Sequence, residues 1–225
     1  MSNSNRSYVI GDIHGCAKTF RELVFNQLHV MSGDYVYLLG DLIDRGPDSK
    51  SVLDTIFELI SKGIIVKSII GNHEQLLLDA IDYPYKAEAW LSNGGFKTLD
   101  SFDLINLSQI DSKYYNFIKN MSYYIILEKF VLVHAGLDFE ADDIFRDKST
   151  MLWLRSTFCE PDKIGGRRLI VGHTPKYLNQ ISSSINDNLI YLDGGCVYNT
   201  KPGLGNLVAL DTGAMKLYVQ NNIDI

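Results

Sequence analysis

The sequence has few cysteines, no long apolar run and no excess of basic residues. Its three cysteines, Cys16, Cys159 and Cys196, are too few and too scattered for a disulfide framework or a zinc ribbon. No apolar run approaches the ~20 residues that a helix needs to cross a bilayer. Lys and Arg number 21 against 27 Asp and Glu, a net charge of −6. An acidic chain repels the phosphate backbone, so we expect neither nucleic-acid nor membrane partners.

The composition is that of an ordinary globular protein. Of the 225 residues, 46% are hydrophobic and 21% are charged, which provides enough apolar material for a buried core. The length favours one domain over two, and no linker or repeat divides the chain, so we expect a single domain spanning residues 1–225. The segment from Met1 to Arg6 is polar, so we expect no signal peptide and a reducing, cytoplasmic location.

The first third of the chain alternates strand-like and helix-like segments. Short apolar runs at 8–10, 35–39 and 64–70 predict buried strands, and the runs between them carry apolar residues at helical spacing over 20–28 and 52–60. A strand-helix-strand-helix-strand order predicts a parallel sheet covered by helices. We therefore expect an α/β fold.

The remainder of the chain divides into a helical part and a second group of strands. Residues 76–123 read as mostly helical, with a turn at 93–95, and could form a cap beside the active edge of the sheet. Asp211 to Gly213 carries a hairpin signal between the last two strands. Six further strands are expected, at 124–127, 130–133, 169–171, 189–192, 207–210 and 216–219.

Polar motifs follow five of the expected strands directly. In open α/β sheets, ligands bind beyond the carboxyl ends of the strands, so these motifs should lie close together. Each contains groups that can bind a metal ion, and four of the five begin with glycine. The motifs are GDIHG (11–15), GDLIDRG (40–46), GNHE (71–74), HAG (134–136) and GHT (172–174).

The residue types in these motifs predict a site for two metal ions. Asp12 and His14, two positions apart in an extended segment, can point the same way and bind one cation. Asp41 has two carboxylate oxygens and can bridge that cation to a second one ~3.5–4 Å away. The second cation would have neutral donors from three later motifs: Asn72, His134 and His173. Carboxylate, amide and imidazole ligands favour manganese, iron or zinc over calcium.

The charge of such a site suits a phosphate group. Two divalent cations leave a net positive charge after their carboxylate ligands are counted, and a phosphate dianion would balance it. Arg45 and Arg155 could donate paired hydrogen bonds to the non-bridging phosphate oxygens. Arg167 and Arg168 also precede a motif, so the second of these two assignments is open.

A proton donor for the leaving group is also present. His73 follows Asn72 directly and is placed to protonate the leaving oxygen. Asp44, three residues after Asp41, could hold the imidazole of His73 and raise its pKa. Two metal ions would acidify a bridging water, so that hydroxide is the expected nucleophile and no covalent enzyme intermediate forms.

The five motifs, in this order, closely resemble those of the PPP family of metallophosphatases, within the calcineurin-like phosphoesterase superfamily. The WLSNGG (90–95) and WLR (153–155) segments resemble its phage and bacterial branch. The resemblance implies a central β-sandwich of mixed sheets flanked by helices, and two metal ions, often manganese. It assigns Asp41 as the bridging ligand, His73 and Asp44 as the acid pair, and Arg45 and Arg155 as phosphate clamps. It also assigns the remaining metal ligands, Asp12, His14, Asn72, His134 and His173.

Two positions depart from the pattern of the protein phosphatases. They usually carry Arg just before GNHE, where this chain has Ile70. Symmetrical diadenosine tetraphosphate hydrolases tend to lack that Arg, but they more typically carry Asp in place of Glu74. The two clues therefore disagree about the substrate.

From the sequence we expect a metal-dependent phosphatase that hydrolyses phosphate monoesters, with phosphoserine and phosphothreonine of proteins as its substrates. The alternative is a symmetrical diadenosine tetraphosphate hydrolase, which acts on a small phosphoester substrate. A non-catalytic phosphate-binding protein is opposed by the complete set of ligands and the acid. A nuclease fits poorly with the acidic charge balance. The sequence does not fix the oligomeric state.

Overall fold

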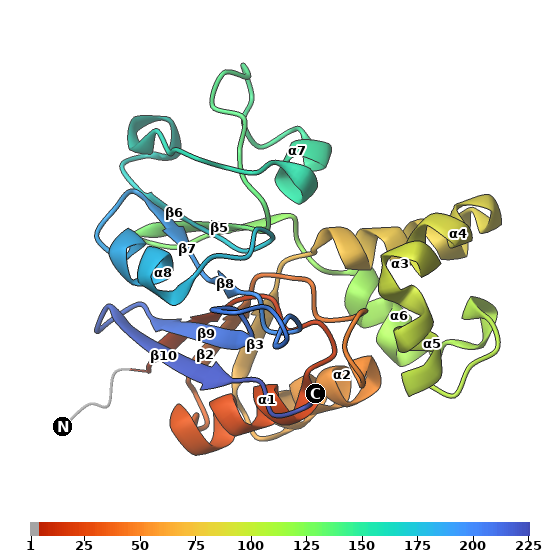
Figure 1. Cartoon of the computed structure of the whole chain (residues 1–225). Coiled ribbons are helices and arrows are strands. Elements are labelled where there is room, and N and C mark those ends of the chain that lie inside the picture. The colour runs from red at the N-terminus through yellow and green to blue at the C-terminus, as the bar shows by residue number, and fades with distance from the viewer. Residues whose placement is uncertain (1–4) are drawn as a thin grey trace.

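Two β-sheets packed face to face form the centre of the computed structural model, which describes residues 5–225 (Figure 1). The first has the strand order β10-β9-β1-β2-β3, with β8 paired to β9, and the second has the order β4-β5-β6-β7. Residues 1–4 of the polar N-terminal segment lie outside the described residues. The strands are β1 (Ser7–Ile10), β2 (Tyr35–Leu38), β3 (Ile65–Ser68), β4 (Tyr124–Ile126), β5 (Phe130–Val133), β6 (Arg168–Val171), β7 (Leu189–Tyr191), β8 (Asp193–Gly194), β9 (Asn206–Asp211) and β10 (Lys216–Asn221).

The pairing of the strands follows the sequence prediction. Strands β1, β2 and β3 are parallel neighbours, as expected from the strand-helix alternation. Strands β9 and β10 form the predicted antiparallel hairpin, with Asp211 opposite Lys216 at its closed end. In the second sheet, β5, β6 and β7 are parallel and β4 is antiparallel to β5. The predicted α/β fold with mixed sheets is confirmed.

Successive side chains of a strand point to opposite faces of its sheet, so each strand contributes to two apolar layers. In β1, Tyr8 and Ile10 point to the helix-covered face of the first sheet, whereas Val9 points to the interface between the sheets. In β5, Leu132 points to the same interface, whereas Val131 packs outward under the loops that carry α7. Strands β1, β2, β5 and β6 are buried on both faces along most of their length, so they read as nearly continuous apolar runs.

Helices cover the outer faces of the sandwich, and α3 to α6 form a separate lobe beside the first sheet (Figure 1). Helix α2 begins after Asp48, whose carboxylate accepts the N–H of Ser51 at 2.9 Å, and it ends before Gly63, which has a φ of +81°. The helices are α1 (Ala17–Arg21), α2 (Ser49–Ser61), α3 (Asn72–Asp82), α4 (Ala87–Trp90), α5 (Phe96–Ser101), α6 (Ser112–Lys119), α7 (Lys148–Trp153) and α8 (Leu178–Ser184).

The lobe is bent at the predicted turn. A π-helical turn, Leu91–Gly95, joins α4 to α5, and Gly94 within it has a φ of +103°. Trp90, at the end of α4, is fully buried. The lobe thus brings a buried aromatic residue toward the loops that follow β2. Between residues 5 and 225, no helix is long and apolar enough to span a membrane.

Candidate active site

The polar motifs meet at the carboxyl ends of the parallel strands, as the sequence predicts. Asp12 and His14 follow β1, Asp41 follows β2, and Asn72 opens α3 after β3. From the second sheet, His134 follows β5 and His173 follows β6. All of these side chains are buried except His173, which is partly exposed. The site is therefore built from both sheets.

The loops that present these side chains have unusual backbone conformations. Five residues of the predicted site have a positive φ, which costs a residue with a Cβ about 1–3 kcal/mol. The surrounding fold must hold such residues in place. They are His14 (+47°), Asp41 (+49°), Asp44 (+70°), Arg45 (+68°) and His173 (+64°).

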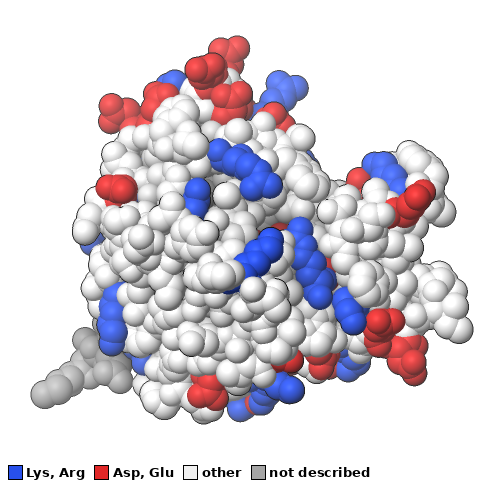
Figure 2. Space-filling model, in the orientation of Figure 1, with Lys and Arg blue, Asp and Glu red and all other residues white. Residues whose placement is uncertain are grey.

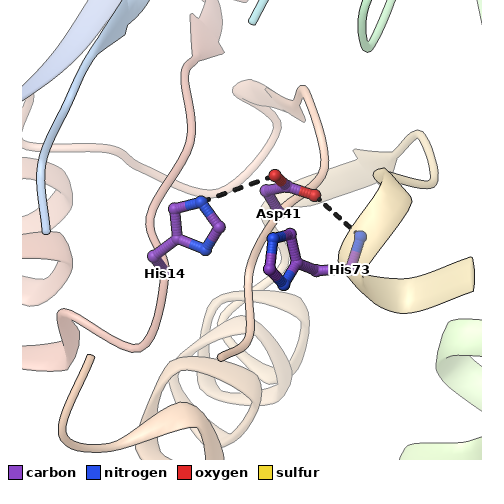
Figure 3. A group of neighbouring side chains, drawn as sticks. All are labelled: His14, Asp41 and His73. Atoms are coloured by element: carbon purple, nitrogen blue, oxygen red, sulfur yellow. Dashed lines mark hydrogen bonds and ion pairs between the residues drawn. The ribbon is translucent and has the colours of Figure 1, made fainter. Parts of the chain in front are cut away.

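Two clusters of possible metal ligands share Asp41. The ligand atoms of His14, Asp41 and His73 lie within 4.8 Å of one another, and those of Asp41, His134 and His173 do so as well. Figure 3 shows the rings of His14 and His73 close together and the carboxylate of Asp41 beside them, with one oxygen facing the ring of His14 and the other accepting the backbone N–H of His73 at 3.1 Å. Nε2 of His14 is 3.4 Å from Oδ2 of Asp41, and Nε2 of His134 is 3.4 Å from Oδ1. Each oxygen thus faces a different cluster, the geometry that a bridging carboxylate needs.

Asn72 lies at the centre of the second cluster. Its Oδ1 is 3.0 Å from Nε2 of His134 and 3.0 Å from Nδ1 of His173. The other ring nitrogen of His134, Nδ1, is 2.7 Å from the carbonyl oxygen of Leu39, so this contact fixes the orientation of the ring. One amide oxygen and two imidazole nitrogens therefore converge beside Asp41.

Asp12 is buried beside the clusters, close enough to interact with the charges of Asp41 and His134. It lies in neither cluster, and its carboxylate accepts the backbone N–H of His173 at 3.0 Å. Burial, followed by the nearby charge of Asp193, raises the pKa of Asp12 well above its usual value. His73, expected only as a proton donor, is the third member of the first cluster.

Asp193 is a site residue that the sequence analysis missed. It is buried beside Asp12, and burial raises its pKa to about 6. It follows the predicted strand at 189–192 and precedes two glycines, the same strand-end pattern that marks the other motifs. That pattern could have identified it.

The electrostatics of the site fit bound divalent cations. Burial raises the pKa of Glu74 to about 7, with a further contribution from Asp41. Burial also lowers the pKa of His14 well below its usual value, which keeps the imidazole neutral, as a metal ligand must be. Burial opposes ionisation of Asp41, but His134 outweighs it and holds the pKa of Asp41 well below its usual value. Burial alone would lower the pKa of His134, but the charge of Asp41 outweighs it and raises that pKa to about 10. A divalent cation would therefore relieve the crowding of buried carboxylates, bind the neutral nitrogen of His14 and take the place of the proton on His134.

The predicted acid pair is in contact. Nδ1 of His73 is 2.8 Å from Oδ2 of Asp44, and both side chains are fully buried. Nε2 of His73 is buried without a hydrogen-bond partner among the described residues. A buried polar atom is seldom left unpaired, so this nitrogen is available for a substrate atom or a metal ion.

Glu74 organises the loops around Asp41, a role that the sequence did not indicate. Its Oε1 accepts the N–H groups of Leu42 (2.8 Å) and Ile43 (3.4 Å). Its Oε2 accepts those of Asp41 (2.9 Å) and Gly71 (2.9 Å). One buried carboxylate therefore joins the loop after β2 to the loop after β3.

Both predicted arginines line a polar pocket of about 290 Å³ over the second cluster. Nη1 of Arg45 also lies 2.8 Å from Nε2 of His14. Lys and Arg side chains gather near the middle of the face where the lobe meets the sandwich, and most acidic side chains lie at its edges (Figure 2). The pocket is lined by Asp41, Arg45, Asn72, Asn93, Trp153, Arg155, His173, Pro175 and Tyr198.

The arginines left open by the sequence have other partners. Arg167 donates to the carbonyl of Leu127 at 2.9 Å, and Arg168 donates to the carbonyl of Asp187 at 2.7 Å. Arg155 is therefore the arginine of this part of the chain that faces the pocket. Ile70 is buried in the core and does not line the pocket.

Comparison with known proteins identifies the family. Residues 6–209 match the family model of the calcineurin-like phosphoesterases, and the chain belongs to this family. It is therefore a hydrolase of the metallophosphoesterase type, as the sequence predicts.

Among curated relatives, the chain is 30% identical over 131 residues to "Bis(5'-nucleosyl)-tetraphosphatase, symmetrical" from Nitrosomonas europaea. This match covers 58% of the chain and 44% of the relative, so the chain spans less than half of that protein's length.

Two solved structures share the fold along the whole chain. One is a protein provisionally assigned as a diadenosine tetraphosphatase, at a TM-score of 0.66 and 19% identity, covering 100% of this chain and 96% of that one. The other is a protein serine/threonine phosphatase from Saccharomyces cerevisiae, at a TM-score of 0.67 and 16% identity, covering 100% and 82%. At these identities the likeness concerns the fold alone.

Proposed function

We propose that this phosphoesterase hydrolyses symmetrical dinucleoside tetraphosphates within a single catalytic domain. The observation that carries the proposal is the composition of the pocket, in which Arg45 and Arg155 lie together with the aromatic residues Trp153 and Tyr198. Arginine pairs suit a polyphosphate chain, and an aromatic face suits a nucleobase. The curated relative that matches 58% of the chain is named for this activity.

The indole of Trp153 is well placed to receive a base. The side chain is 46% exposed and its ring meets that of His173 edge-on, with centroids 6.1 Å apart. Elsewhere in the lining of the same pocket, the guanidinium of Arg45 lies 5.8 Å from the centroid of the Tyr198 ring. A phosphate chain bound between the arginines would therefore have an aromatic ring near its end.

Two divalent cations would complete the site, with manganese as the proposed metal and iron or zinc as alternatives. They would be held by Asp41 together with His14 and Asp12 on one side, and by Asp41 together with the remaining three ligands, Asn72, His134 and His173, on the other. When bound, they supply Lewis acidity and lower the pKa of a water molecule toward neutral.

The chain's own residues then position the substrate and supply a proton. Arg45 and Arg155 bind the non-bridging oxygens and orient the phosphorus atom toward the clusters. His73 donates a proton from Nε2 to the leaving oxygen, and Asp44 holds its Nδ1 at 2.8 Å. Symmetrical cleavage adds one water molecule to the central phosphoanhydride bond. That bond breaks, and the products are two nucleoside diphosphates.

The test is a direct comparison of substrates with metal-reconstituted protein. We expect kcat/KM for diadenosine tetraphosphate to exceed that for any peptide of a phosphoserine and phosphothreonine panel, with ADP as the nucleotide product. Trp153→Ala should raise KM for the dinucleotide about tenfold or more, since base stacking is worth ~1–3 kcal/mol. Tyr177→Ala is the matched control, because Tyr177 is an exposed aromatic residue outside the pocket. A higher kcat/KM for a phosphopeptide would overturn the proposal.

Hydrolysis of phosphoserine and phosphothreonine in proteins is the second candidate. It is favoured by the resemblance of the motif set to the protein phosphatases, and Phe158, 53% exposed shortly after Arg155, offers an apolar contact for a peptide. The same substrate panel decides between the two candidates.

We also propose a cytoplasmic location. The three cysteines are unpaired, as expected in a reducing compartment. Fluorescence microscopy of a tagged chain in its host cell would test this location.

A further inference from the structure

We infer that Trp90 and Thr98 of the helical lobe are positioning residues for the acid pair, because both donate hydrogen bonds to the buried carboxylate of Asp44. This inference rests on the proposed function, in which His73 protonates the leaving group. It assigns to the lobe a part in catalysis beyond lining the pocket.

The hydrogen bonds to Asp44 come from three elements. Nε1 of Trp90 donates to Oδ2 at 2.9 Å, and the hydroxyl of Thr98 donates to Oδ1 at 2.6 Å. Nδ1 of His73 contacts the same oxygen as Trp90, Oδ2, at 2.8 Å. Trp90, Thr98 and Asp44 are 0%, 3% and 0% exposed, so water does not compete for these bonds. All three residues that contact this carboxylate thus come from helices of the lobe, and Trp90 and Thr98 are the two that the sequence analysis did not assign to the site.

The lobe also holds the backbone that carries Asp44. The N–H of Asp44 is shared between the hydroxyl oxygens of Ser49 and Thr98, each 3.0 Å away. The N–H of Arg45 donates to the carbonyl oxygen of Gly94 at 3.2 Å. Asp44 and Arg45 are consecutive residues with positive φ, a conformation that needs such outside support.

Trp90 is itself held in one orientation. A Cβ added to Gly95 would lie 2.3 Å from Cε2 of the indole. The ring therefore packs directly against the backbone of Gly95, where any side chain would clash with it. The indole cannot rotate away from Asp44 without displacing the turn that joins α4 to α5. Trp90 and Thr98 therefore set the direction of the carboxylate, which in turn orients His73.

The experiment uses two aryl phosphates that differ in their need for a proton. Dinitrophenolate leaves from 2,4-dinitrophenyl phosphate unaided, whereas phenolate leaving from phenyl phosphate needs general acid catalysis. We expect Trp90→Phe and Thr98→Val to lower kcat for phenyl phosphate about tenfold and to leave kcat for the dinitrophenyl ester within twofold. Thr98→Ser keeps the hydroxyl and should restore kcat for phenyl phosphate. KM should stay unchanged, because the pocket is intact.

Leu99→Ala is the control for loss of packing in the lobe. Leu99 packs against the core, and its apolar side chain offers no hydrogen bond to Asp44. This variant should lower the Tm without changing the ratio of the two kcat values. Equal losses on both esters in Trp90→Phe and Thr98→Val would overturn the inference and leave the proposed function standing, as would a Thr98→Ser variant that behaves like Thr98→Val. If the wild-type protein hydrolyses neither ester nor the dinucleotide, the proposed function fails, and the inference fails with it.

Discussion

Glu74 offers a direct test of how the metal-binding loops are held together. The substitution Glu74→Gln replaces one carboxylate oxygen with an NH₂ group, which cannot accept a hydrogen bond. Whichever oxygen is replaced, two of the four backbone N–H donors lose their acceptor: either Asp41 and Gly71, or Leu42 and Ile43. A buried donor left unpaired costs about 1–3 kcal/mol, so the pair should cost about 3–5 kcal/mol.

That loss is a large part of the ~5–15 kcal/mol by which a domain is stable. Because the pKa of Glu74 is about 7, urea unfolding at a pH well above 7, where the group is a carboxylate, would measure this loss. Calorimetric titration with manganese would show weaker binding, because Asp41 is no longer fixed. Glu58→Gln is the control: Glu58 contacts Arg21 and Lys62 at the surface, so its loss should cost less than about 1 kcal/mol. If Glu74→Gln is as stable as Glu58→Gln, the account of these loops is wrong.

Three further predictions concern metal ions, backbone and pH. Chelation should lower the Tm, and manganese at 100 times Kd should raise the free energy of unfolding by about 2.7 kcal/mol, whereas Asp41→Asn should respond weakly in the same calorimetric scan. Gly40→Ala should be several kcal/mol less stable to urea than Gly166→Ala, because a Cβ at Gly40 would lie 2.4 Å from the Gly71 nitrogen while Gly166 has open space around it. Burial opposes ionisation of Asp34, but hydrogen bonds from Arg6 hold its pKa below its usual value. Its contribution is therefore present above the unfolded pKa of about 4 and lost as pH falls through the lower, folded pKa. Asp34→Asn should thus destabilise the protein at pH 7 and not at pH 2 in urea unfolding, and equal losses at both would refute this.

Much of the fold could be predicted because its signals are local. Runs such as 35–39 are apolar without interruption, and glycines mark where they end, so strand positions and the β9–β10 hairpin follow from the sequence. The order of strands in each sheet depends on pairing between distant segments. The antiparallel contact of β1 with β9, with Val9 opposite Leu210, has no local signal in the sequence.

In the candidate site as well, the features with a local signal could be predicted and those that depend on distant contacts could not. Motif spacing indicated the residues of both clusters, because each follows a strand directly. The pairing of Asp12 with the backbone of His173, and the four bonds of Glu74, depend on loop conformations with positive φ that spacing does not encode. Trp90 was visible only as part of a family segment. Its contact with Asp44 depends on how the helices of the lobe pack, and the periodicity of apolar residues in the sequence does not predict that packing.

The contact between Asp12 and His173 joins residues that are 161 positions apart in the chain. During synthesis, the chain emerges from the ribosome with Asp12, His14 and Asp41 long before His134 and His173 are made. The early segment can bind cations only weakly through its exposed carboxylates, and the second cluster forms when the second sheet docks. Metal loading should therefore occur after translation has passed β6, and a ribosome-bound nascent chain stalled before that strand should retain no manganese after gel filtration.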